Sequence, residues 1–203
     1  MSLLTSFIAN VKHESALNLY NSTRDDPPIS LPLTTDSPEI TIRAGDCIVL
    51  VGASGSGKSW TLSLLAEQVL QHTNSDVIYL DLDNRFNRSE LVEHERFHLF
   101  QPSTPAQIYA TVLGLDEWLD RNAGQHVMCV LVDDGNEALD RKISVHLRQT
   151  QSKWDFALVI ATLREQHRMR TSEQTWKVVK GNDGHVRLMI RETAHIIADG
   201  KKQ

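Results

Sequence analysis

The sequence has little cysteine, no long apolar run and no excess of positive charge. Its two cysteines, Cys47 and Cys129, both lie inside apolar stretches, which favours buried thiols in a reducing compartment over a disulfide or a metal pair. No apolar run approaches the roughly 18 residues that a membrane-spanning helix needs. No charged segment followed by an apolar one marks a secretion signal at the N-terminus. We therefore expect a globular protein of a reducing compartment that has no membrane partner.

The charge balance limits the possible partners. The net charge is −5, and the nine histidines follow no metal-ligand spacing. A negative net charge argues against a protein that is basic throughout and binds nucleic acid by charge alone, although it permits a local basic patch. The 203 residues, 40% of them hydrophobic, suffice for one domain with its own core.

One glycine-rich stretch carries the strongest chemical signal. The pattern G-x-x-x-x-G-K-S is met at Gly52, Gly57, Lys58 and Ser59. The apolar run 47–51 precedes the pattern and an apolar-periodic segment at about 58–72 follows it, which is the strand–loop–helix context that a phosphate-binding loop requires. Glycines let backbone N–H groups approach an anion, and a helix N-terminus stabilises negative charge. The residues expected to bind ATP are Gly52, Ala53, Ser54, Gly55, Ser56, Gly57, Lys58, Ser59 and Trp60.

A metal site is expected beside this loop. In such sites Lys reaches the outer phosphates, while the Ser hydroxyl and an acid that follows a buried strand hold Mg²⁺. We therefore expect Ser59 to be one metal ligand. Asp133 directly follows the apolar run 127–132 and is the first candidate for the acid, with Asp134 as the second. The alternative is that both aspartates cap the following helix.

Hydrolysis would also need a group that orients the attacking water. Asp83 lies two residues beyond the apolar strand expected at 77–81 and is the candidate catalytic residue. Its side chain is one methylene shorter than that of Glu, so its reach is in question. Asp also favours turns, and a turn-capping role is the alternative.

The order of the segments predicts an α/β fold. Near-continuous apolar strands at 47–51, 77–81, 97–100, 127–132 and 156–161 alternate with amphipathic helices, which is typical of a mostly parallel sheet with helices on both faces. A C-terminal hairpin, at about 175–180 and 185–191, is expected to add an antiparallel edge. Ligands of such sheets bind beyond the carboxyl ends of the strands. The polar residues at these ends are Asp81, Asp83, Asp133, Asp134 and Thr162.

Two domains of different character follow from the distribution of Pro and polar residues. Residues 1–38 contain clustered prolines and are expected to be an arm or linker, possibly partner-binding, with a short helix at about 3–19. In the rest of the chain, Ser103 is expected to cap a helix that has Pro105 in its first turn. Residues 39–203 form the expected ATPase core.

A basic run follows the fifth strand. Its residues are Arg164, His167, Arg168 and Arg170, with Lys177 and Lys180 nearby. Such cations can contact a phosphate backbone without reading sequence, or they can belong to a solvated loop. Trp176 is either a base-stacking aromatic or part of the core.

Together these motifs resemble the RecA superfamily, specifically the eukaryotic recombinase paralogues, over about residues 39–200. Residues 52–59 match the Walker A loop and residues 130–133 resemble Walker B. Residues 79–86 resemble the family's Tyr-Ile-Asp-Thr-Glu-Gly-x-Phe segment, with Asp83 at the place of the catalytic Glu. Residues 157–162 resemble the strand before the second DNA loop, and residues 195–200 resemble the closing strand. Asp83, in place of Glu, is similar to the recombinase paralogues of the X-ray-repair cross-complementing type that consist of the ATPase core alone.

The sequence departs from the family pattern at two places, and these departures limit the function that the resemblance implies. Arg164 stands where recombinases carry the Gln that senses the γ-phosphate, and residues 135–140 leave little room for a first DNA loop. The resemblance therefore implies a RecA-type core that acts as a mediator subunit in the nucleus, as a heterodimer with another paralogue. Such a subunit would promote recombinase filament assembly on single-stranded DNA during homologous-recombination repair, with weak or no ATP hydrolysis.

Two other functions are compatible with the same motifs. A small-molecule P-loop kinase would use Asp81, Asp83 and Arg85 to activate a nucleoside or nucleotide. A scaffold would keep the loop for stability alone.

Overall fold

The computed structural model describes residues 28–31, 40–134, 139–163, 173–181, 183–190 and 193–196. The strands of its central sheet are β3 (Cys47–Val51), β4 (Asp76–Asp81), β5 (Phe97–Phe100), β6 (Val127–Asp134), β7 (Ala157–Thr162), β8 (Glu173–Lys180), β9 (Val186–Ile190) and β10 (Thr193–Ile196). The helices are α2 (Lys58–His72), α3 (Ser89–Val92), α4 (Pro105–Arg121) and α5 (Arg141–Trp154).

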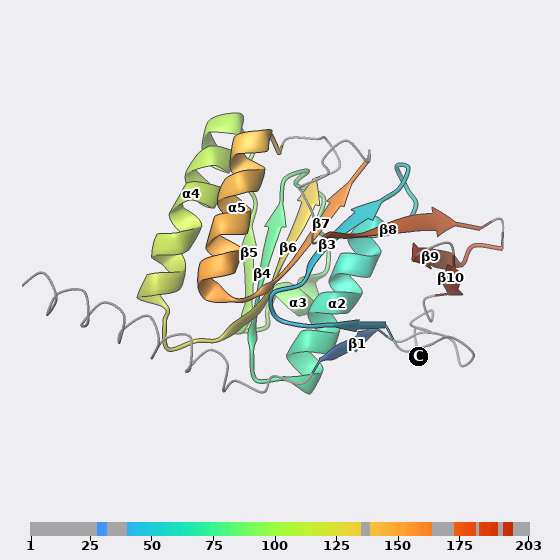
Figure 1. Ribbon diagram of the computed structural model, residues 1–203, viewed down its shortest axis with the longest axis horizontal. Helices are drawn as coiled ribbons and strands as arrows, with labels where there is room; N and C mark the ends of the chain where they lie inside the picture. The colour runs from blue at the N-terminus through green and yellow to red at the C-terminus, as the bar shows by residue number, and fades with distance from the viewer. Residues whose placement is uncertain are drawn as a thin grey trace, which may run out of the picture.

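The eight strands form one mixed sheet in the order β10-β9-β8-β3-β7-β6-β4-β5 (Figure 1). The pairs from β8 to β5 are all parallel, while β9 and β10 are antiparallel. The predicted α/β class, with its mostly parallel sheet and C-terminal antiparallel hairpin, is confirmed. One detail differs, because β8 pairs with β3 in parallel and the antiparallel edge begins only at β9.

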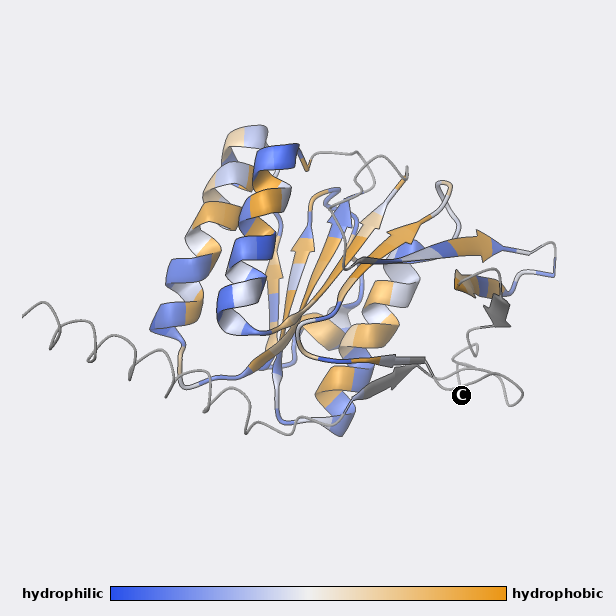
Figure 2. Ribbon diagram, viewed as in Figure 1, coloured by the Kyte–Doolittle hydropathy of each residue, from blue (hydrophilic) through white to orange (hydrophobic). Residues whose placement is uncertain are grey.

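Helices cover both faces of the sheet, as predicted (Figure 1). One buried cluster joins α2 to one face of the sheet, through residues such as Leu62, Leu65, Tyr79 and Leu131. A second buried cluster joins α4 and α5 to the opposite face. Figure 2 shows the hydrophobic strands between helices whose outer sides are largely hydrophilic. This two-sided burial explains why the strands are apolar almost without interruption.

The helix starts follow local capping rules. Thr104 accepts a hydrogen bond from Gln107 N and completes a capping box before Pro105, so the cap is Thr104 and the expected cap at Ser103 is wrong. Asp140 accepts hydrogen bonds from the N–H groups of Lys142 and Ile143 at the start of α5. The buried stripe of α4 consists of Ile108, Val112, Leu115 and Leu119.

A small hairpin precedes the sheet. Strand β1 (Ile29–Leu31) pairs antiparallel with β2 (Ile40–Ile42), and β1 lies against α2. Strand β1 lies inside the segment 1–38 that is expected to be an arm or linker. The prolines around it favour irregular chain, so the sequence does not predict a strand there. The helix expected at 3–19 lies outside the described residues. Within the part of the chain that the structure describes, no helix is long and apolar enough to span a membrane.

One side chain, that of Arg96, holds the C-terminal end of α2 in place. The guanidinium of Arg96 donates to the carbonyl oxygens of Leu70, Thr73 and Ser75 at 2.6, 2.8 and 3.0 Å. These carbonyls belong to the last turn of α2 and to the chain that leads into β4, where intrahelical partners are missing. Arg96 therefore ties the start of β5 to the end of the helix that follows the phosphate loop.

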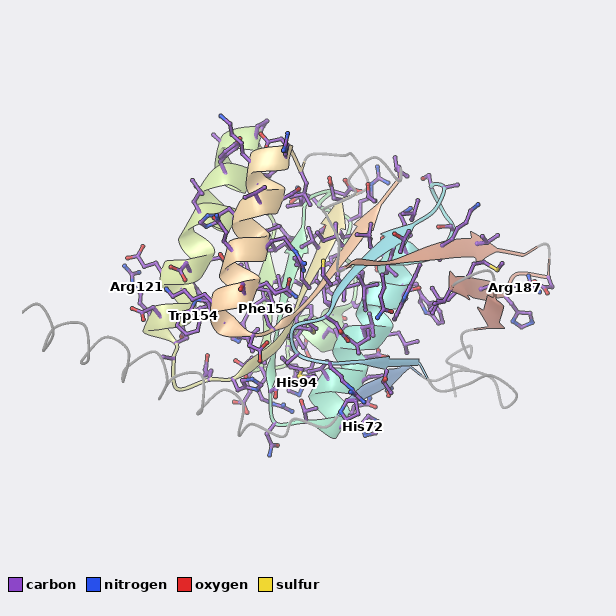
Figure 3. All side chains as sticks on the ribbon, in the orientation of Figure 1. His72, His94, Arg121, Trp154, Phe156 and Arg187 are labelled. Atoms are coloured by element: carbon purple, nitrogen blue, oxygen red, sulfur yellow. The ribbon has the colours of Figure 1, made fainter. Side chains whose placement is uncertain are left out.

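Arg96→Met is expected to lower the free energy of unfolding by about 2–3 kcal/mol, because hydrogen bonds from a charged donor are lost at partly buried carbonyls. The melting temperature should fall by about 5–10 °C in a domain of this size. The matched control is Arg121→Met, since Arg121 lies on the outer surface of α4 (Figure 3) and pairs only with exposed Glu117; its effect should stay below about 0.5 kcal/mol. Equal effects of the two substitutions in thermal denaturation would contradict this assignment.

Candidate nucleotide-binding site

The phosphate loop adopts the backbone conformation that its glycines permit. It joins β3 to α2, and Gly55 and Gly57 have φ angles of 75° and 102°. Residues with a Cβ seldom adopt these left-handed angles. Gly57 is also the N-cap of α2, where no side chain caps the helix. The first N–H groups of α2 are therefore available to an anion.

The C-terminal hairpin packs directly against this loop. A Cβ at Gly57 would lie 2.7 Å from a methyl group of Val186 on β9. A Cβ at Gly52 would lie 2.5 Å from the carbonyl oxygen of Val178 on β8. Both distances are shorter than any real contact of a Cβ atom. The two motif glycines are thus required by packing as well as by phosphate access, which the sequence pattern does not show.

Lys58 is held inside the loop. Its Nζ donates to the carbonyl oxygens of Gly52 and Ala53 at 2.8 and 3.0 Å. Burial lowers the pKa of Lys58, and the negative charges of Asp133 and Asp83 oppose that shift. Both of these acceptors are neutral carbonyl oxygens. A phosphate group in the loop would supply the charged acceptor that this ammonium group lacks.

Asp133 lies beside the loop on the face of the sheet that α2 covers. Residues alternate between the faces of a strand, and Cys129 and Leu131 belong to the cluster under α2. The carboxylate of Asp133 accepts a hydrogen bond from the hydroxyl of Tyr79 at 3.2 Å. Burial raises the pKa of Asp133, the nearby hydroxyls of Ser59 and Tyr79 lower it, and the charges of Asp83 and Asp81 raise it further.

Asp134 has a different role from Asp133. The same alternation turns it toward the opposite face, where Val130 and Val132 belong to the second cluster. Its Oδ2 accepts a hydrogen bond from Leu139 N at 3.1 Å, and in the parallel register it lies beside Thr162. Asp134 and Thr162 are both fully buried. Of the two candidate acids, only Asp133 faces the phosphate loop.

Asp81 is structural. It is fully buried, and its Oδ2 accepts from Phe86 N at 2.9 Å and from the side-chain amide of Gln101 at 2.8 Å. These bonds fold the chain after β4 back over the end of the strand. Tyr79 and Phe86 are the two ends of the segment that resembles the recombinase pattern, and Gln101 lies in no motif; the sequence does not assign any of the three to the site.

Asp83 lies on a loop that is anchored at both ends. Asn84 adopts a left-handed φ of 54° and donates to the carbonyl oxygen of Pro102 at 3.3 Å. Arg88 forms ion pairs with Glu67 of α2 and with Glu90. One carboxylate oxygen of Asp83, Oδ1, is buried and has no hydrogen-bond partner among the residues that the structure describes. Its charge acts on both Lys58 and Asp133, so Asp83 lies near the expected position of the outer phosphates.

The residues present suit a magnesium nucleotide. Among the described residues, no group of three His, Cys, Asp or Glu side chains could hold a metal ion. Mg²⁺ in nucleotide sites is held by one or two protein groups together with phosphate oxygens and water, and Ser59 and Asp133 provide such a pair. The buried hydroxyl of Ser56 and the Oδ1 of Asp83 also lack partners, as expected where a ligand completes the hydrogen bonding.

The expected DNA-contact residues are mostly outside the described part of the chain. Arg164, His167, Arg168 and Arg170 all belong to that undescribed segment, whereas Lys177 is exposed on β8. Trp176 is 1% exposed and belongs to the core, so it is not a base-stacking aromatic. The DNA contact stays a prediction.

A glycine loop between a buried strand and a helix, with Lys and Ser facing an acid on a parallel strand, defines a P-loop nucleotide-binding domain. Residues 42–169 match the AAA domain family. The match covers more than half of the chain, and the protein belongs to this family of P-loop ATPases. No curated protein gives a significant match to the sequence. The family match includes the loop, Asp83 and Asp133, and it ends before β8.

Asp133→Asn is expected to stabilise the empty protein at pH 7. The pKa of Asp133 is raised in the folded state, so ionising this carboxyl at neutral pH weakens the fold. A gain of about 1 kcal/mol would raise the melting temperature by about 2–4 °C. The gain should shrink as the pH falls toward about 4, where the carboxyl of unfolded wild-type protein also becomes protonated. A lower melting temperature for the variant at pH 7 would contradict this account.

Proposed function

We propose that this protein is an ATP-binding mediator subunit of homologous-recombination repair that hydrolyses ATP slowly. It works in the nucleus as a heterodimer with another recombinase paralogue and promotes the assembly of a recombinase filament on single-stranded DNA. The observation that carries the proposal is an intact phosphate loop beside a short acid, Asp83, on an anchored loop. The site is built to hold Mg-ATP more effectively than to turn it over.

Nucleotide retention is supported by the groups around the loop. The glycine backbone and the uncapped start of α2 receive the phosphates, and Lys58 exchanges neutral carbonyl acceptors for charged ones. The Ser59 hydroxyl is close enough to Asp133 to lower the pKa of that carboxyl, so the two side chains are near enough to share one metal ion. When bound, Mg²⁺ would neutralise charge that develops on the phosphate oxygens.

Slow turnover is supported by the position of Asp83. A general base must come within hydrogen-bond reach of the attacking water, directly or through one further water. The loop that carries Asp83 is tied by Asn84 to Pro102 and by Arg88 to Glu67. Because the backbone is held in place, the missing methylene relative to Glu is not recovered by movement of the loop.

The mediator role is supported by the order and spacing of the motifs between residues 52 and 200, which resemble the recombinase paralogues. Membership in the AAA domain family is consistent with that role and does not single it out. Exposed Lys177 on β8, together with the basic residues at 164–170, supports contact with a phosphate backbone.

No observation favours the kinase alternative. Asp81, which that function would use to activate a substrate, is fully buried and accepts hydrogen bonds from Phe86 and Gln101. Transfer of phosphate to a nucleoside acceptor would nevertheless decide for a kinase and against the mediator role.

Turnover of ATP by the full chain is expected to be roughly 10⁻² s⁻¹ or less, the range of P-loop GTPases that lack an activating partner. Asp83→Glu should raise this rate about tenfold, because the longer carboxylate reaches the attacking water and a positioned base contributes substantially to the rate. Asp83→Asn is the matched control and should not raise it. Steady-state phosphate release with and without single-stranded DNA measures both. Fast, DNA-stimulated hydrolysis by the wild-type protein would contradict the proposal.

Lys58→Ala is expected to abolish ATP binding, because no other described cation takes part in the loop's hydrogen bonding. If ATP controls assembly, the same substitution should weaken capture of the partner paralogue from the protein's own cells. Co-purification with wild-type protein as reference measures this effect. Unchanged partner capture would instead indicate a scaffold that keeps the loop only for stability.

A further inference from the structure

We propose that Tyr79 is a positioning residue that orients Asp133 for Mg²⁺ and couples the metal site to the loop that carries Asp83. The inference rests on the proposed nucleotide site and gives a role to a residue that the sequence does not assign to it. Its basis is a set of contacts in which one buried side chain joins three elements of that site: β6, α2 and the loop after β4.

The first contact is with the metal acid. Tyr79 is fully buried on β4, and β4 is the direct neighbour of β6 in the sheet. The Tyr79 hydroxyl donates to Oδ2 of Asp133 at 3.2 Å, and the Ser59 hydroxyl lies near the same carboxylate and lowers its pKa. Burial and the adjacent Asp133 carboxylate raise the pKa of Tyr79, so the hydroxyl keeps its proton and remains a donor.

The second contact is with the helix that begins at the phosphate loop. Ser63 of α2 lies close to the Tyr79 hydroxyl and opposes the rise in the pKa of Tyr79. The Ser63 hydroxyl also donates to the carbonyl oxygen of Ser59 at 3.0 Å. Tyr79 is therefore adjacent to both elements that carry the expected metal ligands, Asp133 on β6 and Ser59 on α2.

The third contact is with the loop after β4. The ring centroids of Tyr79 and Phe86 are 4.7 Å apart, and Phe97 lies 5.9 Å from Tyr79 and 5.4 Å from Phe86. Phe86 follows Asp83 by three residues, and its N–H donates to Asp81. The ring that places the hydroxyl against Asp133 therefore also supports the loop that positions Asp83.

Loss of the hydroxyl should affect the metal site more than the fold. Asp133 lies opposite Asp81 in the register of β4 and β6, and like charges in that arrangement repel each other. The Tyr79 hydrogen bond holds the Asp133 carboxylate against this repulsion. Groups that orient a metal ligand from outside the ligand shell typically contribute 10- to 100-fold to metal affinity.

The test is Tyr79→Phe in the full chain, with a fluorescent ATP analogue as the probe. In EDTA, the dissociation constant of the analogue should change by less than about twofold, because the phosphate loop is untouched. In a titration with MgCl₂, the half-saturating Mg²⁺ concentration should rise about tenfold. This readout involves binding only and does not depend on hydrolysis.

The control is Phe97→Leu, which disturbs the same aromatic cluster and leaves the hydroxyl in place. It should lower the melting temperature without shifting the Mg²⁺ titration. An unchanged Mg²⁺ titration in Tyr79→Phe, or an equal shift in Phe97→Leu, would overturn the role of Tyr79 and leave the nucleotide site standing. Failure of the wild-type protein to bind the analogue would overturn both proposals.

Discussion

Parallel strands end at the same edge of a sheet, and in this protein three of the groups that gather there are carboxylates. Asp81 and Asp133 lie opposite each other on β4 and β6, and Asp83 acts on the same neighbourhood. Lys58 is the buried cation that faces them. Concentrating like charges in a buried place raises the free energy of the folded state. The hydrogen bond from Tyr79 to Asp133 and the nearby Ser59 hydroxyl offset part of this cost, and a metal ion with its phosphates would offset more.

The phosphate loop depends on a part of the chain outside the family match. That match ends at residue 169, whereas Val178 and Val186 of the C-terminal hairpin approach the positions of Gly52 and Gly57. Since interiors are close-packed, a change in the loop is transmitted to a neighbour at such distances. The hairpin therefore supports the conformation of the phosphate loop.

Membership in the AAA domain family and the resemblance to recombinase paralogues support conclusions of different detail. Membership in the AAA domain family establishes a P-loop ATPase domain. The proposed mediator role depends on what surrounds the loop: a short acid on an anchored segment, and a buried Asp81 that accepts hydrogen bonds from Phe86 and Gln101. These features favour a site that binds ATP and hydrolyses it slowly over one that hydrolyses it rapidly.

The sequence alone determined the class of the fold and the phosphate loop, because both depend on local patterns: apolar strands alternating with amphipathic helices, and a glycine spacing that few other structures require. It also placed Asp133 and Asp83 at strand ends. Tertiary structure alone decided between Asp133 and Asp134, since the pleat turns adjacent residues to opposite faces and only one face carries α2. It also assigned Trp176 to the core and Tyr79, Phe86 and Gln101 to the site, because their roles arise from contacts between strands that are distant in the chain.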